Sequence, residues 1–188
     1  YSLMNQVGFM LVGIGIGTEL ALNGAVAHAF CHIIYKALLF MAAGSVLQMT
    51  GKIKCTELGG LYKTMPLTCL FCMVGALSIS AFPLFSGFVS KSMIVSASGH
   101  EKLFLIWMVL QFASTGVVDH AGIKVPFFTF FGHDSGIRAK EPPLNMLFAM
   151  GIAAALCVGL GVFYQPLYNL LPFPVHYEPY TGGHVIGQ

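Results

Sequence analysis

Residues 24–47 read GAVAHAFCHIIYKALLFMAAGSVL, an apolar stretch that carries three basic side chains, His28, His32 and Lys36. Each of the three lies four residues from the next, and four residues of an α-helix turn through roughly 400°, so they form a single polar stripe. The stretch is about as long as the roughly 20 residues that a helix needs to cross a bilayer. We therefore expect a transmembrane helix over residues 24–47, with Lys36 near the middle of the membrane.

A lysine at this depth in the membrane is energetically unfavourable, so its presence indicates a function. A charged side chain at the centre of a transmembrane helix costs about 3 kcal/mol on the insertion scale. Ionisable groups that are kept inside membranes commonly mark proton and ion pathways. We interpret the stripe of His28, His32 and Lys36 as a proton-handling or ion-handling site. The alternative is a structural lysine that pairs with a carboxylate on a neighbouring helix.

The composition also indicates a membrane protein. Of the 188 residues, 56% are hydrophobic and only 9% are charged, whereas soluble domains are about 25% charged. The formal net charge of +2 is too small to indicate a nucleic-acid partner. The sequence begins with Tyr1 and shows no cleavable signal, so we expect a fragment whose upstream part is absent.

Other apolar segments lie on both sides of the histidine-rich stretch. They cover residues 3–22, 66–77, 103–131 and 144–171, and a tail rich in Pro and Gly follows from Pro172. Each long segment matches the length of a membrane crossing. The sequence therefore predicts an all-α fold, a polytopic transmembrane helix bundle of about six spans.

One of these spans is expected to be a discontinuous helix. Residues 78–91 read SISAFPLFSGFVSK, and the residues that break helical character there are Ser78, Ser80, Pro83, Ser86 and Gly87. Irregular backbone at membrane depth is tolerated only where it faces protein or water, and interrupted helices form ion sites in transporters. Lys91 follows the break directly, which makes it a second candidate for proton handling. The alternative is an ordinary interfacial turn from which Lys91 extends to the membrane surface.

The second half of the 103–131 segment carries Asp119, His120 and Lys124. When a carboxylate and an ammonium group pair near the membrane–water interface, each lowers the free-energy cost of placing the other in the membrane. We interpret these three residues as the water-facing exit of a proton path. The alternative is an ion pair without a role in transport.

Three strings in this order resemble a known family. They are AHAFCHIIYKALLFMAAGSVLQ at 27–48, ELGGLYKTMP at 57–66 and ALSISAFPLFSGFVSK at 76–91. They are similar to the antiporter-like membrane subunits shared by complex I and the Mrp-type cation/proton antiporters, and most similar to the D-type members of the Mrp branch. The resemblance is strong over about the first hundred residues and looser beyond.

The resemblance implies two inverted five-helix repeats, each with a proton half-channel. Residues 1–131 resemble the second repeat, and residues 132–188 would add a loop, one further transmembrane helix and an irregular tail. The central lysine of the second repeat falls on Lys36, the histidine one turn before it on His32, and the lysine of the broken helix on Lys91. The first repeat is missing. Lys124 stands where complex I members often carry an arginine, which favours the antiporter branch.

The function expected from these observations is that of a membrane subunit of a multisubunit monovalent cation/proton antiporter. Lys36 would store a proton, while His28 and His32 would relay it, because histidine titrates near neutral pH. Expected partners are the other membrane subunits of such an assembly, the lipid bilayer, protons and Na⁺ or K⁺. The expected location is the inner membrane of a prokaryote.

Two other classes of function remain open. One is a proton-pumping subunit of complex I or of a related membrane-bound hydrogenase, in which other subunits would carry the electrons, so enzymatic chemistry is not assigned to this chain. The other is a haem-binding anchor with His28 or His32 and His120 as axial ligands. The antiporter interpretation requires no cofactor and no metal site.

Overall fold

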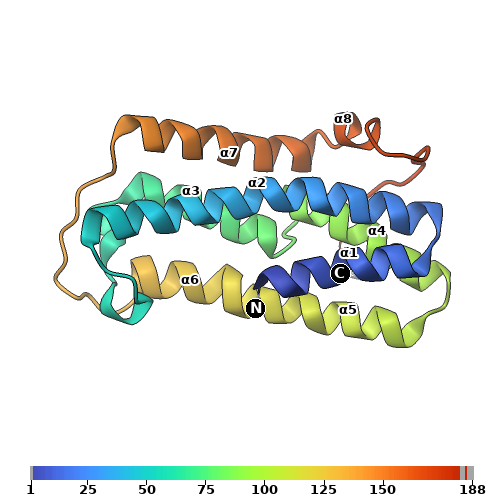
Figure 1. Ribbon diagram of the computed structural model, residues 1–188, viewed down its shortest axis with the longest axis horizontal. Helices are drawn as coiled ribbons and strands as arrows, with labels where there is room; N and C mark the ends of the chain where they lie inside the picture. Colours follow the sequence, from blue (N-terminus) through green and yellow to red (C-terminus); the bar gives the residue numbers. More distant parts are fainter. Residues whose placement is uncertain (1, 183–184, 186–188) are drawn as a thin grey trace.

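The computed structural model describes residues 2–182 and residue 185, and the described part is helical without strands. Figure 1 shows helices that run roughly parallel to one long axis. Their bounds are α1 Ser2–Ile16, α2 Glu19–Thr50, η1 Cys55–Glu57, η2 Leu61–Lys63, α3 Pro66–Ile79, α4 Ser86–His100, α5 Phe104–Val117, η3 Val118–Ile123, α6 Lys124–Pro126, η4 Phe127–Phe131, α7 Leu144–Val162 and α8 Gln165–Tyr168. The expected all-α helix bundle is confirmed.

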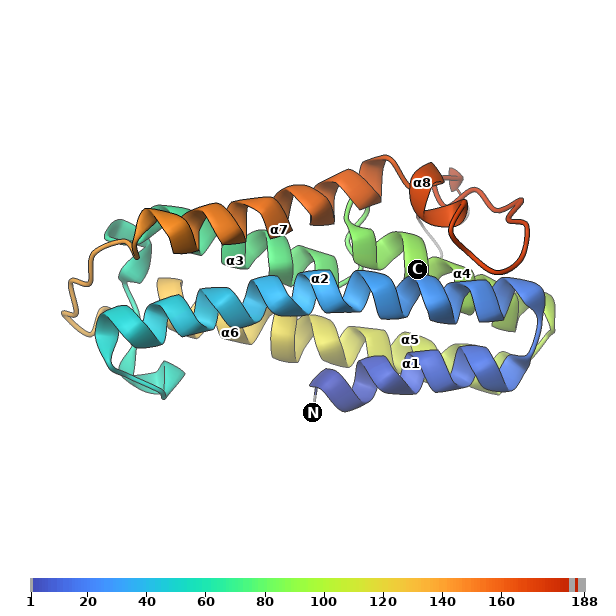
Figure 2. The ribbon, with the colours of Figure 1, turned by 45° about the horizontal axis from the view of Figure 1, so that its top comes forward.

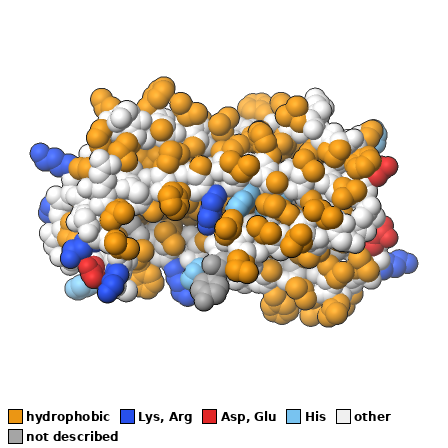
Figure 3. Space-filling model, in the orientation of Figure 1, with side chains coloured by type: hydrophobic (Ala, Val, Ile, Leu, Met, Phe, Trp, Pro, Cys, Tyr) orange, Lys and Arg blue, Asp and Glu red, His pale blue; other side chains and the backbone are white. Residues whose placement is uncertain are grey.

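Three helices in the described part are long and apolar enough to cross a membrane. They are Glu19–Thr50, the continuous Phe104–Phe131 and Leu144–Val162, while α1 and α3 are shorter apolar helices. In Figure 3 hydrophobic side chains cover the middle of the visible face, and most charged side chains gather at its two ends. This distribution is the one expected of a helix bundle that lies across a bilayer.

Helix α2 is the centre of the bundle and packs against α1, α3, α4 and α7. Figures 1 and 2 both show α7 and the helix made of α5 and α6 on opposite sides of it. The expected boundary between the first two spans, near residue 23, is wrong. The chain turns instead at Gly17, where φ is 76°, and Thr18 caps α2 by accepting a hydrogen bond from the Ala21 amide. Apolar residues continue across this turn, so hydrophobicity alone did not reveal it.

The predicted helix break is confirmed. Helix α3 ends at Ile79 and α4 begins at Ser86, and between them Ala81 and Leu84 have positive φ angles of 56° and 74°. Figure 1 shows α3 and α4 following one another end to end along the bundle. Helix α4 thus begins at Ser86, which is still inside the serine-rich segment of residues 78–90. Because a helix of about 15 residues is only about 22 Å long, the two pieces together make one crossing.

Close packing holds the two halves of the interrupted helix together. A Cβ atom on Gly87 would overlap the Ser78 carbonyl oxygen, so only glycine allows the second half to approach the first this closely. On α7, a Cβ atom on Gly161 would overlap the Leu84 carbonyl oxygen in the same way. The Tyr180 hydroxyl donates a hydrogen bond to the Gly161 carbonyl, which fixes the tail against this point.

The last helix is shorter than expected. The sequence predicts a span over 144–171, but α7 ends at Val162 and the short helix α8 follows with Pro166 in its first turn. Proline lacks an N–H and is favoured at a helix start, so a new helix begins there. The irregular tail is confirmed over its described part. It is tied to α2 because the Asn23 side chain exchanges two hydrogen bonds with the Phe173 backbone, at 3.0 and 3.1 Å.

The helix over Phe104–Phe131 agrees with the expected 103–131 segment, but it is not a regular α-helix throughout. Its second half contains two stretches of wider π-helical turns, Val118–Ile123 and Phe127–Phe131. Pro126 lies between them and cannot donate a backbone hydrogen bond to the preceding turn. Widened turns of this kind reposition the side chains around them and occur frequently at functional sites.

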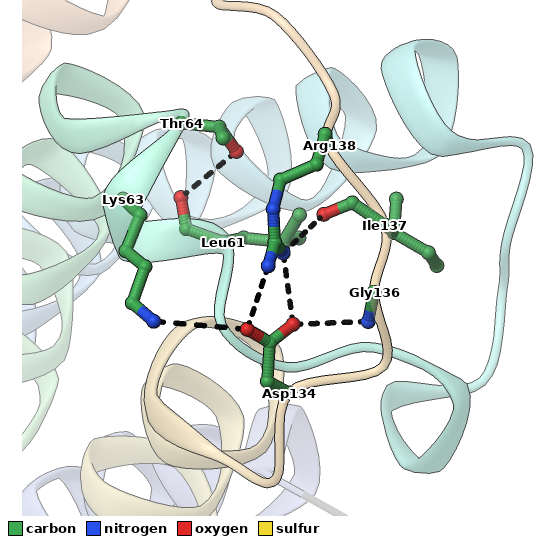
Figure 4. A network of polar contacts seen from close by, with 7 residues as sticks. All are labelled: Leu61, Lys63, Thr64, Asp134, Gly136, Ile137 and Arg138. Atoms are coloured by element: carbon green, nitrogen blue, oxygen red, sulfur yellow. Dashed lines mark hydrogen bonds and ion pairs between the residues drawn. The ribbon is translucent and has the colours of Figure 1, made fainter.

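Two loops at one end of the bundle are joined by an ionic network centred on Asp134, which Figure 4 shows. The two Asp134 carboxylate oxygens accept hydrogen bonds from Arg138, both at 2.8 Å, and one of them also accepts from the Gly136 amide at 2.9 Å. Lys63, in the loop before α3, lies 3.7 Å from the same carboxylate. The Arg138 guanidinium, together with the Gly136 amide, holds the pKa of Asp134 well below its usual range.

Candidate functional site

The polar centre of the bundle is a cluster of buried side chains around His28. The Nε2 atom of His28 lies 2.8 Å from the Gln6 amide oxygen, and Nδ1 lies 3.0 Å from the Ser90 hydroxyl. The Tyr35 hydroxyl donates to the same Gln6 oxygen at 3.0 Å. All four side chains are fully or almost fully buried. Three helices, α1, α2 and α4, thus contribute to one hydrogen-bonded group in an otherwise apolar interior.

Lys91 is buried at the helix break, with 2% of its surface exposed. Its ammonium Nζ donates to the carbonyl oxygen of Ile79, the last residue of α3, at 2.8 Å. The last carbonyls of a helix lack partners within the helix and carry a partial negative charge, so a cation is favoured there. The interruption therefore creates the place in which Lys91 is held. The Phe9 ring adds a second stabilising contact, with its centroid 5.2 Å from Nζ.

A polar cavity of about 140 Å³ lies beside Lys91. Its lining includes Ser80 and Ala81 from the break and three polar residues of α5, Gln111, Ser114 and Thr115. A cavity of this size holds several water molecules, and hydroxyl and amide groups in its wall can bind them. The cavity therefore offers space for water between Lys91 and α5.

His32 and Lys36 continue the stripe along α2, as the sequence predicts. The rings of His28 and His32 are stacked with centroids 6.3 Å apart, and the ring of Tyr35 lies 5.4 Å from that of His32. The Nε2 atom of His32 has no hydrogen-bond partner within the described part of the chain. Lys36 is half-buried near the middle of α2, and its ammonium group donates to the Ser2 hydroxyl at 3.3 Å. The stripe thus runs from a buried end at His28 to a more open end at Lys36.

The three residues that we interpret as an exit lie apart from this cluster. Asp119 and Lys124 form an ion pair of 3.2 Å on the fifth span, Phe104–Phe131, with about two thirds and one half of their side-chain surfaces exposed, respectively. Asp119 lies in the first π-helical stretch and Lys124 begins α6. His120 beside them is exposed as well. The structure therefore does not bring these three residues into the buried cluster around His28.

The predicted break residues occupy different places. Ser78 and Ser86 are buried at the ends of the two half-helices, Pro83 lies in the linker, and Gly87 allows the close approach described above. Ser80 borders the cavity beside Lys91. Among the predicted break residues, Ser80 is thus the one that lines the cavity beside Lys91.

Gln6 and Tyr35 are site residues that the sequence analysis missed. Tyr35 lies seven residues after His28, which places it on the same face of α2 two turns later. Gln6 is an uncharged polar residue in an apolar helix, which is visible in the sequence. The sequence does not show, however, that its side chain contacts His28. Gln111, Ser114 and Thr115 were likewise missed, because no charge draws attention to them in the sequence.

The arrangement also bears on a haem-binding function. Both ring nitrogens of His28 are engaged in hydrogen bonds, so neither is free to bind iron. His32 and His120 belong to different places, one in the buried stripe and the other exposed on the fifth span. The alternative of a haem anchor, which would pair His120 with one of the other two histidines, therefore finds no support in this geometry.

Comparison with known proteins agrees with the fold. The family model described as "NADH:quinone oxidoreductase/Mrp antiporter, TM" matches residues 1–116. The chain is 30% identical over 172 residues to the D subunit of the Na(+)/H(+) antiporter of Alkalihalophilus pseudofirmus, covering 90% of this chain and 34% of the relative. It is also 30% identical over 175 residues to the L subunit of the NADH-quinone oxidoreductase of Campylobacter jejuni, covering 91% of this chain and 28% of that protein.

A solved structure is similar as well. A chain of the membrane-bound sulfane sulfur reductase, an archaeal respiratory membrane complex, superposes with a TM-score of 0.80 at 32% identity, covering 90% of this chain and 29% of the other. The chain thus spans about a third of the length of the proteins it matches. The family match covers more than half of the chain, so this protein belongs to the NADH:quinone oxidoreductase/Mrp antiporter transmembrane family.

Proposed function

We propose that this chain is part of a membrane subunit of a multisubunit monovalent cation/proton antiporter and that it moves protons along its buried polar residues. The observation that carries the proposal is the place of Lys91. It is an ammonium group buried at a helix break, beside a polar cavity and next in sequence to Ser90, the partner of His28. Ionisable groups in such positions mark proton and ion pathways in membrane proteins.

The proposed path has a water-accessible end and a buried middle. Water in the cavity brings protons to and from Lys91. His28 and His32 each carry an imidazole ring that can take up and release a proton, and their stacked rings lie along one face of α2. Lys36 receives the proton at the more open end of the stripe. Each step would transfer one proton between imidazole, hydroxyl and ammonium groups, with water carrying it where two groups are not in direct contact, and no bond between heavy atoms is broken.

The remaining expected features extend the proposal. Asp119, His120 and Lys124 would form a water-facing exit on the fifth span. Residues 1–131 would be the second of two inverted five-helix repeats, and 132–188 would follow it with the further helix α7 and the tail. Other membrane subunits would surround the chain in the inner membrane of a prokaryote, and Na⁺ or K⁺ would be the exchanged ion.

A second candidate function is a proton pump driven by a redox reaction, as a subunit of a complex I-like or hydrogenase-like assembly. The similarity to the L subunit of an NADH-quinone oxidoreductase supports it, and it would use the same path. The two functions differ in the neighbouring subunits. Genes for cation-antiporter subunits beside this one would support the first, and genes for iron–sulfur and quinone-site subunits would support the second.

The proposal is tested by Lys36→Ala in the full-length protein within its assembled membrane complex. Proton movement is followed with a pH-sensitive dye in sealed vesicles after a Na⁺ or K⁺ pulse, or after the reductant when the complex is redox-driven. We expect strongly reduced proton movement with normal assembly. The matched control is Lys54→Ala, which removes an exposed loop lysine. Transport equal to that of the control, at equal protein level, would refute the role of Lys36.

A further inference from the structure

We infer that Gln6 of α1 is a positioning residue for His28, because it fixes which ring nitrogen of this histidine can take up a proton. The inference rests on the proposed function and adds a residue on a different helix from the histidine stripe. Gln6 is fully buried, and its side chain contacts His28 and Tyr35. It carries no charge and cannot itself take up the proton.

The argument begins with the Gln6 amide oxygen, which can only accept hydrogen bonds and has two lone pairs for them. The Tyr35 hydroxyl donates to this oxygen at 3.0 Å, and His28 Nε2 lies 2.8 Å from it. A bond between Nε2 and an acceptor requires a proton on Nε2. In a neutral imidazole only one nitrogen carries a proton, so Nδ1 of His28 is the free base.

The free base is thereby directed toward α4. His28 Nδ1 lies 3.0 Å from the hydroxyl of Ser90, the residue before Lys91. In the neutral state this hydroxyl donates to Nδ1. The Phe9 ring also lies near the histidine, with ring centroids 6.0 Å apart, and it offers no proton donor or acceptor of comparable strength. The tautomer thus decides whether the basic nitrogen faces the Lys91 region or the Gln6 side of the bundle.

The same geometry accommodates the protonated state without movement of heavy atoms. When one proton is added to Nδ1, both ring nitrogens become donors. Nε2–H keeps its bond to Gln6, and Nδ1–H donates to the Ser90 oxygen. The Ser90 proton then rotates toward the Gly87 carbonyl at 3.3 Å or the Ser86 carbonyl at 3.5 Å. Because both ring nitrogens of His28 keep a hydrogen-bond partner in each state, His28 can change its charge at little structural cost.

Few charged or titratable groups compete for control of His28. Those that face it are Lys91 of α4 and, on its own helix, His32 and Tyr35, and the Cys31 thiol of α2 contacts the Ser90 hydroxyl. Helix α1 contributes the uncharged Gln6 and Phe9. Gln6 is therefore the group through which α1 acts on the histidine, by hydrogen bonding rather than by charge.

Three variants of the full-length protein in its membrane complex test the inference. Gln6→Leu removes the acceptor, whereas Gln6→Glu keeps an oxygen acceptor at the same place. The control is Asn5→Leu, which makes the same kind of change on the neighbouring residue of α1. Asn5 donates to the Ala113 carbonyl at 3.0 Å and makes no hydrogen bond to His28. The effect of Asn5→Leu on proton movement therefore measures what any amide-to-apolar replacement in α1 does, apart from the contact with His28.

The first readout is the tautomer, which does not depend on transport. Solid-state ¹⁵N NMR is recorded on the complex labelled with ¹⁵N-histidine, and the signals lost in His28→Gln identify His28. We expect protonated Nε2 and bare Nδ1 in the parent and in Asn5→Leu, and we expect Nε2 to stay protonated in Gln6→Glu. We expect Gln6→Leu to populate the form with the proton on Nδ1. An unchanged tautomer in Gln6→Leu, or the opposite tautomer in the parent, would overturn the inference.

The second readout is the pH profile of proton movement. Gln6→Leu should lower the rate below that of Asn5→Leu at every pH. Gln6→Glu should restore transport with a profile displaced to higher pH, because a carboxylate stabilises the imidazolium. Equal rates in Gln6→Leu and Asn5→Leu would show that the tautomer does not matter for transport. If proton movement is also normal in Lys36→Ala, the proposed function is wrong. The NMR measurement of the tautomer still decides whether Gln6 positions His28, because it does not depend on transport.

Discussion

At the residue scale, the most informative side chain is Lys91, because its surroundings explain why a charge can be kept inside the bundle. The ammonium group donates to the Ile79 carbonyl at the open end of α3 and lies over the Phe9 ring. The sequence placed Lys91 beside a helix break, and the structure adds the partner that stabilises it. Gln6 could not be assigned from the sequence, because its role depends on how α1 packs against α2, which brings together two residues that are 22 positions apart.

The ionic network around Asp134 gives a residue-scale prediction outside the membrane. Asp134→Asn should speed backbone hydrogen exchange in the loops 51–65 and 132–138 at pH 7, because the bonds to Arg138 and Lys63 weaken. The pKa of Asp134 is lowered in the folded protein, so its contribution is present above the unfolded value of about 3.9 and is lost as the pH falls through the folded pKa.

The parent and Asp134→Asn should therefore converge only in strong acid. The control is Glu57→Gln, which removes an ion pair with Lys52 that lies within one loop. That change should leave the exchange of 132–138 unaltered. Equal exchange of the parent and Asp134→Asn at pH 7 would contradict the bridging role of Asp134.

At the scale of single elements, the interrupted helix is the feature that the sequence predicted best. Proline, glycine and serines between two apolar runs indicated the break between α3 and α4, and the structure confirms it. The helix ends at Ile16 and Val162 were not predicted. Apolar residues continue through both points, and the turns depend on the positive φ of Gly17 and on the packing of the tail against α2.

The close approach at Gly87 supports an element-scale prediction. Gly87→Ala places a methyl group against the Ser78 carbonyl, so the two half-helices must separate. We expect a lower temperature of unfolding of the full-length protein in detergent, together with reduced proton movement. Overpacking of a tight site costs about 1–3 kcal/mol.

The matched control for this change is Gly99→Ala on the same helix, where a Cβ atom meets nothing within 4 Å. Alanine is preferred to glycine in a helix, so this variant should be at least as stable as the parent. Equal thermal stability of Gly87→Ala and Gly99→Ala would show that the break is not closely packed.

At the scale of the whole molecule, the bundle distributes its basic loop residues unequally between its two ends. The sequence alone left the membrane orientation open, because alternating spans would place basic residues in loops on both sides. In the structure the loops 51–65 and 132–143 lie at the same end (Figure 1). They carry Lys52, Lys54, Lys63, Arg138 and Lys140, whereas the turn between α4 and α5 at the other end carries Lys102.

This asymmetry predicts the orientation of the chain. Loops rich in Lys and Arg stay on the cytoplasmic side of a membrane, so the end with 51–65 and 132–143 should face the cytoplasm. Single cysteines at Lys54 and Lys102, in a protein whose native cysteines are replaced, are labelled with a membrane-impermeant maleimide in right-side-out vesicles. Lys102→Cys should react and Lys54→Cys should not. The reverse pattern would contradict the predicted orientation.

The central claim, that protons move along the buried polar path, is tested most directly by Lys91→Ala in the full-length protein within its complex. Proton movement is measured in sealed vesicles against Lys140→Ala, which removes an exposed loop lysine. We expect the rate to fall at least about tenfold below that of the control, which corresponds to about 1.4 kcal/mol of barrier. Lys91→Glu should keep part of the activity, since it restores an ionisable group. Proton movement in Lys91→Ala equal to that of Lys140→Ala, at equal assembly, would contradict the account.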